Sequence, residues 1–199
     1  MTASFMRIIL VLLLVTAGVA SALGAPPPSR PDTGIGTLVV SALPDATEPP
    51  ELILYREPGI GRIAAKSAAS FPHLATPLKA PSGQYPLVVT ARKGGWLQVI
   101  HDDAGRAAWL EPRRAWPFVP WDEMLKGRGA RLLRGLKKPF YILWGSGGST
   151  VPDLEPLTPE RSFRIIAVDG DRIQVLLDLT VMGWLRWRDE DGRLLITLE

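Results

Sequence analysis

The chain has 199 residues, enough for one domain or two small ones, and a hydrophobic share of 46% that is ordinary for a globular protein. It contains seven tryptophans, 19 glycines, 19 prolines and no cysteine. Its cores must therefore be held by packing around large rings, without disulfides. The net charge of +3 is too small to require a polyanionic partner, and no nucleic acid partner is expected.

Residues 1–22 have the pattern of a signal peptide. Arg7 supplies the positive charge, residues 8–20 form the apolar run, and residues 20–22 fit a cleavage site. The apolar run is shorter than the roughly 20 residues that a membrane-spanning helix needs. We therefore expect cleavage and export to the periplasm or the medium, with an uncleaved anchor as the alternative. The proline-rich residues 23–35 are expected to be a spacer.

Short β-leaning runs separated by glycine and proline dominate the next part of the chain. An alanine-rich stretch, residues 63–70, predicts at most one short helix before a series of prolines. Gly94-Gly95 and the stretch 103–105 are natural hairpin turns. The expected strands are 37–42, 52–57, 87–91, 96–101 and 107–111.

The last part of the chain has the same character after a basic stretch. Residues 119–139 are rich in glycine and bases and are expected to be a linker. Because long helical patterns are absent, the sequence predicts a mainly β protein. The expected strands after the linker are 140–144, 163–168, 172–177, 182–187 and 194–198.

The two strand clusters repeat one pattern, which indicates an internal duplication. Residues 87–111 align with 163–186, with one residue deleted in the second turn, and a weaker match pairs residues 53–55 with 142–144. The aligned positions are Leu87 with Phe163, Ala91 with Ala167, Gly94 with Gly170, Leu97-Gln98-Val99 with Ile173-Gln174-Val175, and Ala108-Trp109-Leu110 with Gly183-Trp184-Leu185.

The run "LILYREPG", the strand "GGWLQV" and the returning strand "AWLE" resemble the bacterial SH3-like domain. The first copy departs from the family pattern at Ala108, where glycine is usual, and in a proline-rich insertion over residues 64–84. The second copy keeps Val175, Gly183 and Trp184, but Arg172 stands where the first tryptophan should be. The matching positions of the first copy are Arg56, Pro58, Gly59, Gly95, Trp96, Val99 and Trp109.

The resemblance implies two small, partly open SH3-like β-barrels in tandem, over residues 36–118 and 140–199. Relatives of this kind are mostly exported and use the domain as a binding or targeting accessory. The repeat places Trp109 and Trp184 in the two small cores, where each indole would contribute a large share of the buried surface.

No residue pattern in the chain indicates catalysis, a cofactor or a metal. His101 is followed by Asp102, but neighbours on a strand point to opposite faces, so a solvated hairpin tip is expected in place of a catalytic dyad. His73 and His101 lack a zinc spacing. Residues 144–150 lack the ending of a phosphate loop, and the acidic residues 189–191 lack calcium-loop spacing.

Two sets of residues are candidate contacts. Trp116, Trp121 and Trp187 either staple the two barrels together or, with Tyr55 and Trp144, line an exposed groove for an extended peptide or glycan. The basic run in residues 126–138 is either a solvated linker or an anion-facing strip that touches phospholipid headgroups. Its members are Lys126, Arg128, Arg131, Arg134, Lys137 and Lys138.

The expected function is therefore that of an exported, non-enzymatic binding or scaffolding protein of the cell envelope. It would recognise a peptide, a peptidoglycan fragment or a partner protein. A cell-wall hydrolase or a hydrolase inhibitor, with active residues not recognised in the sequence, is one alternative. A structural subunit whose exposed rings meet another protein is a second.

Overall fold

The computed structural model describes residues 31–42, 48–72, 74–145, 147–150 and 155–199. The expected signal peptide, most of the spacer and His73 lie outside the described residues. The fold is mainly β, as the sequence predicts, and consists of two antiparallel sheets. Among the helices described, none has the length and apolar content needed to cross a membrane.

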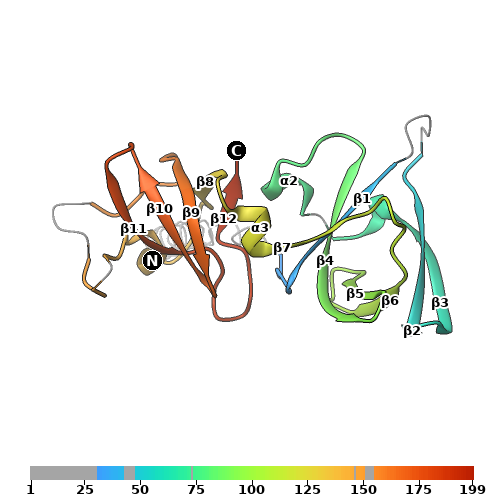
Figure 1. Ribbon diagram of the computed structural model, residues 1–199. Coiled ribbons are helices and arrows are strands. Elements are labelled where there is room, and N and C mark those ends of the chain that lie inside the picture. Colours follow the sequence, from blue (N-terminus) through green and yellow to red (C-terminus); the bar gives the residue numbers. More distant parts are fainter. Residues whose placement is uncertain (1–30, 43–47, 73, 146, 151–154) are drawn as a thin grey trace, which may run out of the picture.

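The first sheet forms what we call the first lobe, residues 36–120 (Figure 1). Its strand order is β3-β2-β6-β5-β4-β1-β7, and neighbouring strands pair antiparallel. The strands are β1 (Gly36–Ser41), β2 (Glu51–Glu57), β3 (Ile60–Ser67), β4 (Gln84–Lys93), β5 (Trp96–Ile100), β6 (Ala107–Leu110) and β7 (Phe118–Pro120).

The second sheet forms the second lobe, residues 129–199, at the other side of Figure 1. Its order is β11-β10-β9-β8-β12. The strands are β8 (Gly129–Leu132), β9 (Phe163–Asp169), β10 (Arg172–Leu177), β11 (Val181–Arg186) and β12 (Ile196–Leu198). Helical turns are short: η1 (Ala68–Ser70), α2 (Ala75–Leu78), α3 (Trp121–Leu125) and η2 (Lys138–Tyr141).

The stretch expected to be a helix is mostly strand β3. Gly59 adopts φ of +74°, a conformation that suits glycine, and the chain turns back there to pair with β2. This hairpin pairs most of β3 with β2, with a bulge between Leu54 and Tyr55. Tertiary pairing thus overrides the helix preference of the alanines. Only residues 68–70 form a helical turn.

The strands expected to be duplicated have the same pairing register in both lobes. In the first lobe Val89 pairs with Val99 and Ala91 with Gln98, so Thr90 is an extra residue at a β-bulge. In the second lobe Ile165 pairs with Val175 and Ala167 with Gln174, which places Ile166 at the same bulge. A bulge at the same aligned position is stronger evidence that the strands are equivalent than a shared hydrophobic pattern, because the bulge fixes which residues pair.

The outer strands extend the correspondence. Strand β1 pairs with β4 and β7, and β8 pairs in the same way with β9 and β12. The expected linker, residues 119–139, therefore contains helix α3 and strand β8, and the second sheet begins at Gly129 instead of residue 140. Ala130 and Leu132 are buried while Arg131 between them is exposed. The alternation of a strand was hidden by the surrounding bases.

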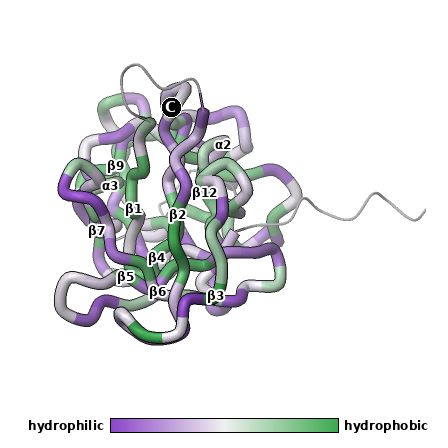
Figure 2. The backbone as a smooth tube through the Cα atoms, turned by 90° about the vertical axis from the view of Figure 1, so that its right-hand side faces the viewer, coloured by the Kyte–Doolittle hydropathy of each residue, from purple (hydrophilic) through white to green (hydrophobic). Residues whose placement is uncertain are grey.

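The first lobe has its own core between its strands. Figure 2, which looks onto this lobe, shows β2 hydrophobic along its middle. Leu52 and Leu54 of β2, Val99 of β5 and Leu110 of β6 are among the buried residues of this core. Inward-facing side chains at alternate positions of each strand account for the pattern.

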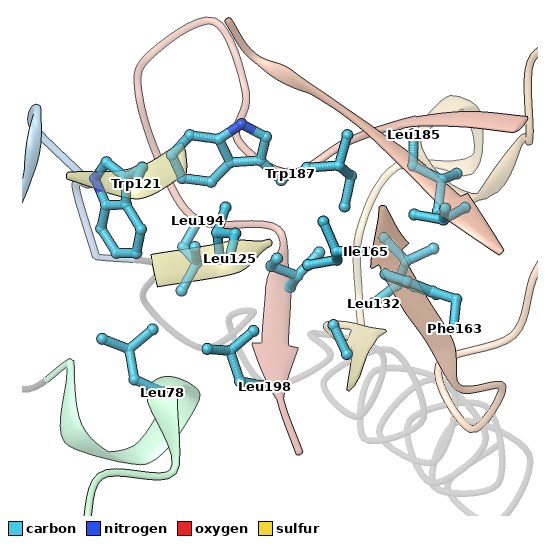
Figure 3. Close-up of a cluster of buried hydrophobic side chains, with 14 of the residues drawn as sticks. Leu78, Trp121, Leu125, Leu132, Phe163, Ile165, Leu185, Trp187, Leu194 and Leu198 are labelled. Carbon is cyan, nitrogen blue, oxygen red and sulfur yellow. The ribbon is translucent and has the colours of Figure 1, made fainter. Parts of the chain in front are cut away.

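A second core is shared between the lobes. It contains the buried residues of the second sheet together with Leu74, Leu78 and Val88 from the first lobe. In Figure 3 the rings of Trp121 and Trp187 lie next to Leu125 and Leu194, with Leu78 below them near Leu198. The two rings are 5.2 Å apart between centroids. The lobes are therefore joined by packed apolar surface.

The end of the expected spacer is part of this junction. The backbone N–H of Thr33 donates to the Gly192 carbonyl at 2.9 Å, and the Thr33 hydroxyl donates to the same oxygen at 2.8 Å. The indole N–H of Trp121 donates to the Thr33 carbonyl at 2.6 Å. Residues 31–34 thus tie the first lobe to the turn before β12, and this part of the spacer is fully structured.

Candidate functional site: a groove beside Trp144

Three of the five aromatic candidates are buried and offer no exposed ring to a ligand. Trp116, Trp121 and Trp187 are 7%, 4% and 1% exposed. Trp116 belongs to the core of the first lobe, and its indole N–H donates to the Ser41 carbonyl. Trp121 and Trp187 lie between the lobes, where they join the two units and do not bind a ligand on an exposed surface. Trp121 and Trp187 line no pocket described here, whereas the edge of Trp116 lines a small crevice of the first lobe together with Tyr55.

Trp109 and Trp184, which were expected in the cores, lie on the outer faces of their sheets. Each is only partly buried, while its neighbours on the strand, Ala108 and Leu110 or Gly183 and Leu185, face inward. Alternation along a strand permits only one of these sets to fill the core. The small residue before each tryptophan leaves room for a buried leucine from the next strand.

Gly183 shows this packing directly. A Cβ built on Gly183 would lie 2.5 Å from Cγ of Leu143, which is itself buried. Leu143 thus fills the space that a side chain at position 183 would need. In the first lobe the matching positions are Leu54, which is buried, and Ala108.

Trp144 lies directly opposite Trp184 on the same outer face. The N–H of Trp144 donates to the Trp184 carbonyl at 3.0 Å, and the N–H of Trp184 donates to the Trp144 carbonyl at 2.7 Å. Residues paired directly across antiparallel strands have side chains on one face. Trp144 is 40% exposed, so this pair presents aromatic surface to solvent.

A groove with a volume of about 860 Å³ opens beside this pair. We call it the Trp144 groove. One wall is aromatic and aliphatic, and the other residues carry charges of both signs. The lining residues are Lys137, Pro139, Phe140, Ile142, Trp144, Gly145, Gly148, Asp169, Arg172, Trp184, Leu185, Arg186, Asp189, Glu190 and Asp191.

Two arginines stand next to each other in the groove. Arg172 on β10 and Arg186 on β11 are directly opposite in the sheet, and Asp169 on β9 lies opposite Arg172 on its other side. An Arg186 nitrogen is 3.4 Å from a carboxylate oxygen of Glu190, which is 88% exposed. The arrangement can hold an anion between two guanidinium groups beside a flat aromatic surface.

The acidic end of the groove is a turn. One Asp189 oxygen accepts the backbone N–H groups of Asp191 and Arg193, at 3.0 and 2.9 Å. These bonds explain the "DEDG" sequence as a turn between strands. Within the described part of the chain, no three His, Asp or Glu side chains converge in a way that could hold a metal ion.

The first lobe has a much smaller cavity at the equivalent place. Tyr55 pairs with Trp109 as Trp144 pairs with Trp184, and a crevice of about 170 Å³ lies beside it. Four lining positions correspond: Ile53 to Ile142, Tyr55 to Trp144, Leu110 to Leu185 and Glu111 to Arg186. Trp96 packs edge-on against Tyr55, with ring centroids 5.2 Å apart. Its counterpart in the second lobe is Arg172, which leaves that surface uncovered.

Comparison with family models and with curated proteins found no match to this chain. The assignment of the site therefore rests on the geometry and chemistry of the groove itself.

His101 and Asp102 do not form a hydrogen-bonded dyad. Nδ1 of His101 is 3.7 Å from the Asp102 carboxylate, which is beyond hydrogen-bond range. That carboxylate accepts the backbone N–H of Arg106 at 3.0 Å and also its guanidinium. These bonds, the backbone one first, lower the pKa of Asp102. The His101 side chain is only 12% exposed, so the hairpin tip is less solvated at this residue than the sequence suggests.

The six bases of the candidate anion-facing strip are all exposed, but they do not form one uncompensated strip. Arg131 contacts the Glu199 carboxylate, and Arg134 donates to Glu160 at 3.1 Å. Lys137 lines the Trp144 groove. The structure thus brings acids from distant parts of the sequence to the middle of the run. The exposed remainder is Lys126, Arg128 and Lys138.

Of the predicted ligand residues, the groove contains Trp144, while Tyr55 and the mostly buried Trp116 line the matching crevice of the first lobe. Phe140, Arg172, Trp184 and Arg186 line the groove but were not predicted as ligand residues. The repeat could have indicated this surface, because the second copy has Arg172 where the first copy has Trp96. Phe140 belongs to η2, which was expected to be a strand.

Proposed function

We propose that this chain is an exported, non-enzymatic binding or scaffolding protein of the cell envelope, built from two SH3-like units, which takes its ligand in the Trp144 groove. The ligand belongs to the class expected from the resemblance: a peptide, a peptidoglycan fragment or a segment of a partner protein.

The observation that supports this proposal most is the pairing of exposed aromatic surface with charged side chains in one concave site. A volume of about 860 Å³ is within the range of roughly 300–1,000 Å³ that is common for ligand sites. Exposed tryptophan offers a large apolar surface at low conformational cost, and the arginines supply directional hydrogen bonds.

The difference between the lobes also supports it. Both lobes have the same cross-strand aromatic pair, but Trp96 covers the pair in the first lobe. Among the residues that the structure describes, no ring covers the pair in the second lobe, where Arg172 occupies the position of Trp96. The first lobe then has the role of a scaffold, and the second carries the ligand.

The test is binding of soluble peptidoglycan fragments to the mature protein, followed by tryptophan fluorescence and calorimetry. Trp144→Ala is expected to abolish the spectral change and weaken binding at least tenfold. Tyr55→Ala, the matched change in the first lobe, should leave binding unchanged. An unchanged spectrum at saturating fragment concentrations, or equal effects of the two variants, would contradict the proposal. Clearing in a peptidoglycan zymogram would favour the hydrolase alternative.

A further inference from the structure

The Trp144 groove contains two arginines that face each other on adjacent strands. Arg172 and Arg186 are directly opposite each other on adjacent strands, where like charges repel. The first lobe has no such pair, since the matching residues there are Trp96 and Glu111. The repeated fold therefore does not require arginines at these two positions.

Four carboxylates, Asp169, Asp189, Glu190 and Asp191, line the groove together with three bases, so the lining as a whole carries no net positive charge. The direct contacts of the two arginines with these acids are nevertheless few. Arg186 has one contact, with Glu190, and that pair is well exposed to solvent, where such contacts contribute little. Arg172 makes no ion pair with a residue that the structure describes. Its nearest acid in the sheet register is Asp169. Guanidinium donors thus remain available to a ligand at the floor of the groove.

The sheet edge beside the arginines is unsuited to a peptide strand. Trp144 already uses both the N–H and the carbonyl of Trp184. A peptide strand added alongside β11 could not form backbone hydrogen bonds with Trp184. Recognition in the groove must therefore come from side chains: the flat faces of Trp144 and Trp184, and the two guanidinium groups next to them.

We propose that the groove binds a saccharide that carries a carboxylate, with a sugar ring against Trp144 and Trp184 and the carboxylate held by Arg172 and Arg186. This inference rests on the proposed function, since it names the ligand class of the same groove. Stacking would use the apolar C–H face of the ring, and planar guanidinium groups match a carboxylate with two parallel hydrogen bonds.

The experiment compares acidic sugars with neutral counterparts that lack free carboxylates. The disaccharide of N-acetylglucosamine and N-acetylmuramic acid, with its free lactyl carboxylate, is titrated beside N,N′-diacetylchitobiose. Trigalacturonate and its methyl ester form the second pair and test whether the carboxylate source matters. We expect the acidic member of at least one pair to bind at least tenfold more tightly, and this preference to weaken as salt is raised.

Variants locate the effect. Arg172→Gln lies at an exposed end of β10 and is expected to remove most of the preference for the acidic member. Arg128→Gln, an exposed base outside the groove, is the matched control and should change nothing. A preference that survives Arg172→Gln would overturn the inference.

The outcomes also separate this inference from the proposed function. Equal binding of acidic and neutral sugars, sensitive to Trp144→Ala, overturns the carboxylate requirement and leaves the groove as a binding site. The same holds if a peptide binds in a Trp144-dependent way and no sugar does. If sugars, peptidoglycan fragments and peptides all fail to bind at the groove, both proposals fail.

Discussion

Trp144 and Trp184 exchange both of their backbone hydrogen bonds across the edge of the second sheet, and Tyr55 pairs with Trp109 at the same place in the first sheet. The aromatic pair is thus a repeated feature of the fold. What differs is its cover. Trp96 packs against Tyr55, whereas the matching Arg172 leaves Trp144 open to solvent.

Arg172→Phe should therefore close the Trp144 groove. A phenyl ring at this position would pack against Trp144 as Trp96 packs against Tyr55, and the exposure of Trp144 would fall. The measurement is acrylamide quenching of tryptophan fluorescence in the absence of ligand, with Arg172→Ala as the control. We expect less quenching for the phenylalanine variant and equal or greater quenching for the alanine variant. Equal quenching of both variants and the parent would show that position 172 does not control access.

The stability of the chain should depend on Trp187 far more than on Trp144. Trp187 is 1% exposed and its indole N–H donates to the Gly170 carbonyl at 2.9 Å. Trp187→Ala should lower the free energy of unfolding by about 3–5 kcal/mol, the usual cost for a buried aromatic. Trp144→Ala removes an exposed cross-strand partner and should cost about 1 kcal/mol. Urea denaturation measures both.

Because the core around Trp121 and Trp187 contains residues of both lobes, Trp187→Ala should also shift the unfolding of the first lobe. A single transition that moves as a whole is expected when circular dichroism and fluorescence are compared. Two separate transitions, with only one of them displaced, would show that the lobes unfold independently.

Gly183→Ala should be destabilising although alanine stands at the matching position 108. The added methyl group would lie 2.5 Å from Cγ of the buried Leu143. Overpacking of this kind costs about 1–3 kcal/mol. The reciprocal change, Ala108→Gly, creates no clash and should cost about 1 kcal/mol or less, mainly through backbone entropy. Equal Tm values for Gly183→Ala and the parent protein would contradict this packing.

The sequence was most informative where the pattern repeats. The alignment of residues 97–99 with 173–175 predicted equivalent strands, and the register at Val99 and Val175 has the same form in both lobes. An ordered series of matches constrains register because each residue must occupy the same face as its counterpart. The bulge itself was not predicted from the sequence, but it lies at the aligned positions Thr90 and Ile166.

The sequence was less informative about which rings are buried. The repeat showed that Trp109 and Trp184 are equivalent, but it did not show which face of the strand they occupy. The small residues Ala108 and Gly183 face inward instead; Leu143 fills the space at Gly183, and Leu54 is buried in the same core as Ala108. Trp121 and Trp187 are buried at the junction of the lobes, which depends on contacts between residues far apart in the chain. Such contacts are absent from any local pattern.

Two carboxylates should make stability fall at low pH. Hydrogen bonds from the Ser162 hydroxyl and then Arg131 lower the pKa of Glu199, and the backbone N–H of Arg106 lowers that of Asp102. A carboxyl whose pKa is lower in the folded chain stabilises it above the unfolded pKa. This contribution disappears as the pH falls through the folded value.

The pH range in which this stability is lost lies below the ordinary pKa values of these groups, 4.5 for Glu199 and 3.8 for Asp102. Glu199→Gln and Asp102→Asn should lower the Tm of the protein at pH 7. The difference in Tm between each variant and the parent should shrink as the pH is lowered below these values. A difference that stays constant down to pH 2 would show that the two carboxylates do not contribute through their ionised forms.

The basic run should bind anionic membranes through its uncompensated members. Arg131 and Arg134 are already paired with Glu199 and Glu160, so neutralising them should have little effect on vesicle binding. Lys126→Gln with Arg128→Gln should reduce retention on phosphatidylglycerol vesicles clearly, because these exposed bases lie beyond the two pairs. Retention should also fall steeply between low and physiological salt, where the Debye length shortens to about 8 Å. Equal retention of both double variants, or binding that does not respond to salt, would exclude this surface as a lipid contact.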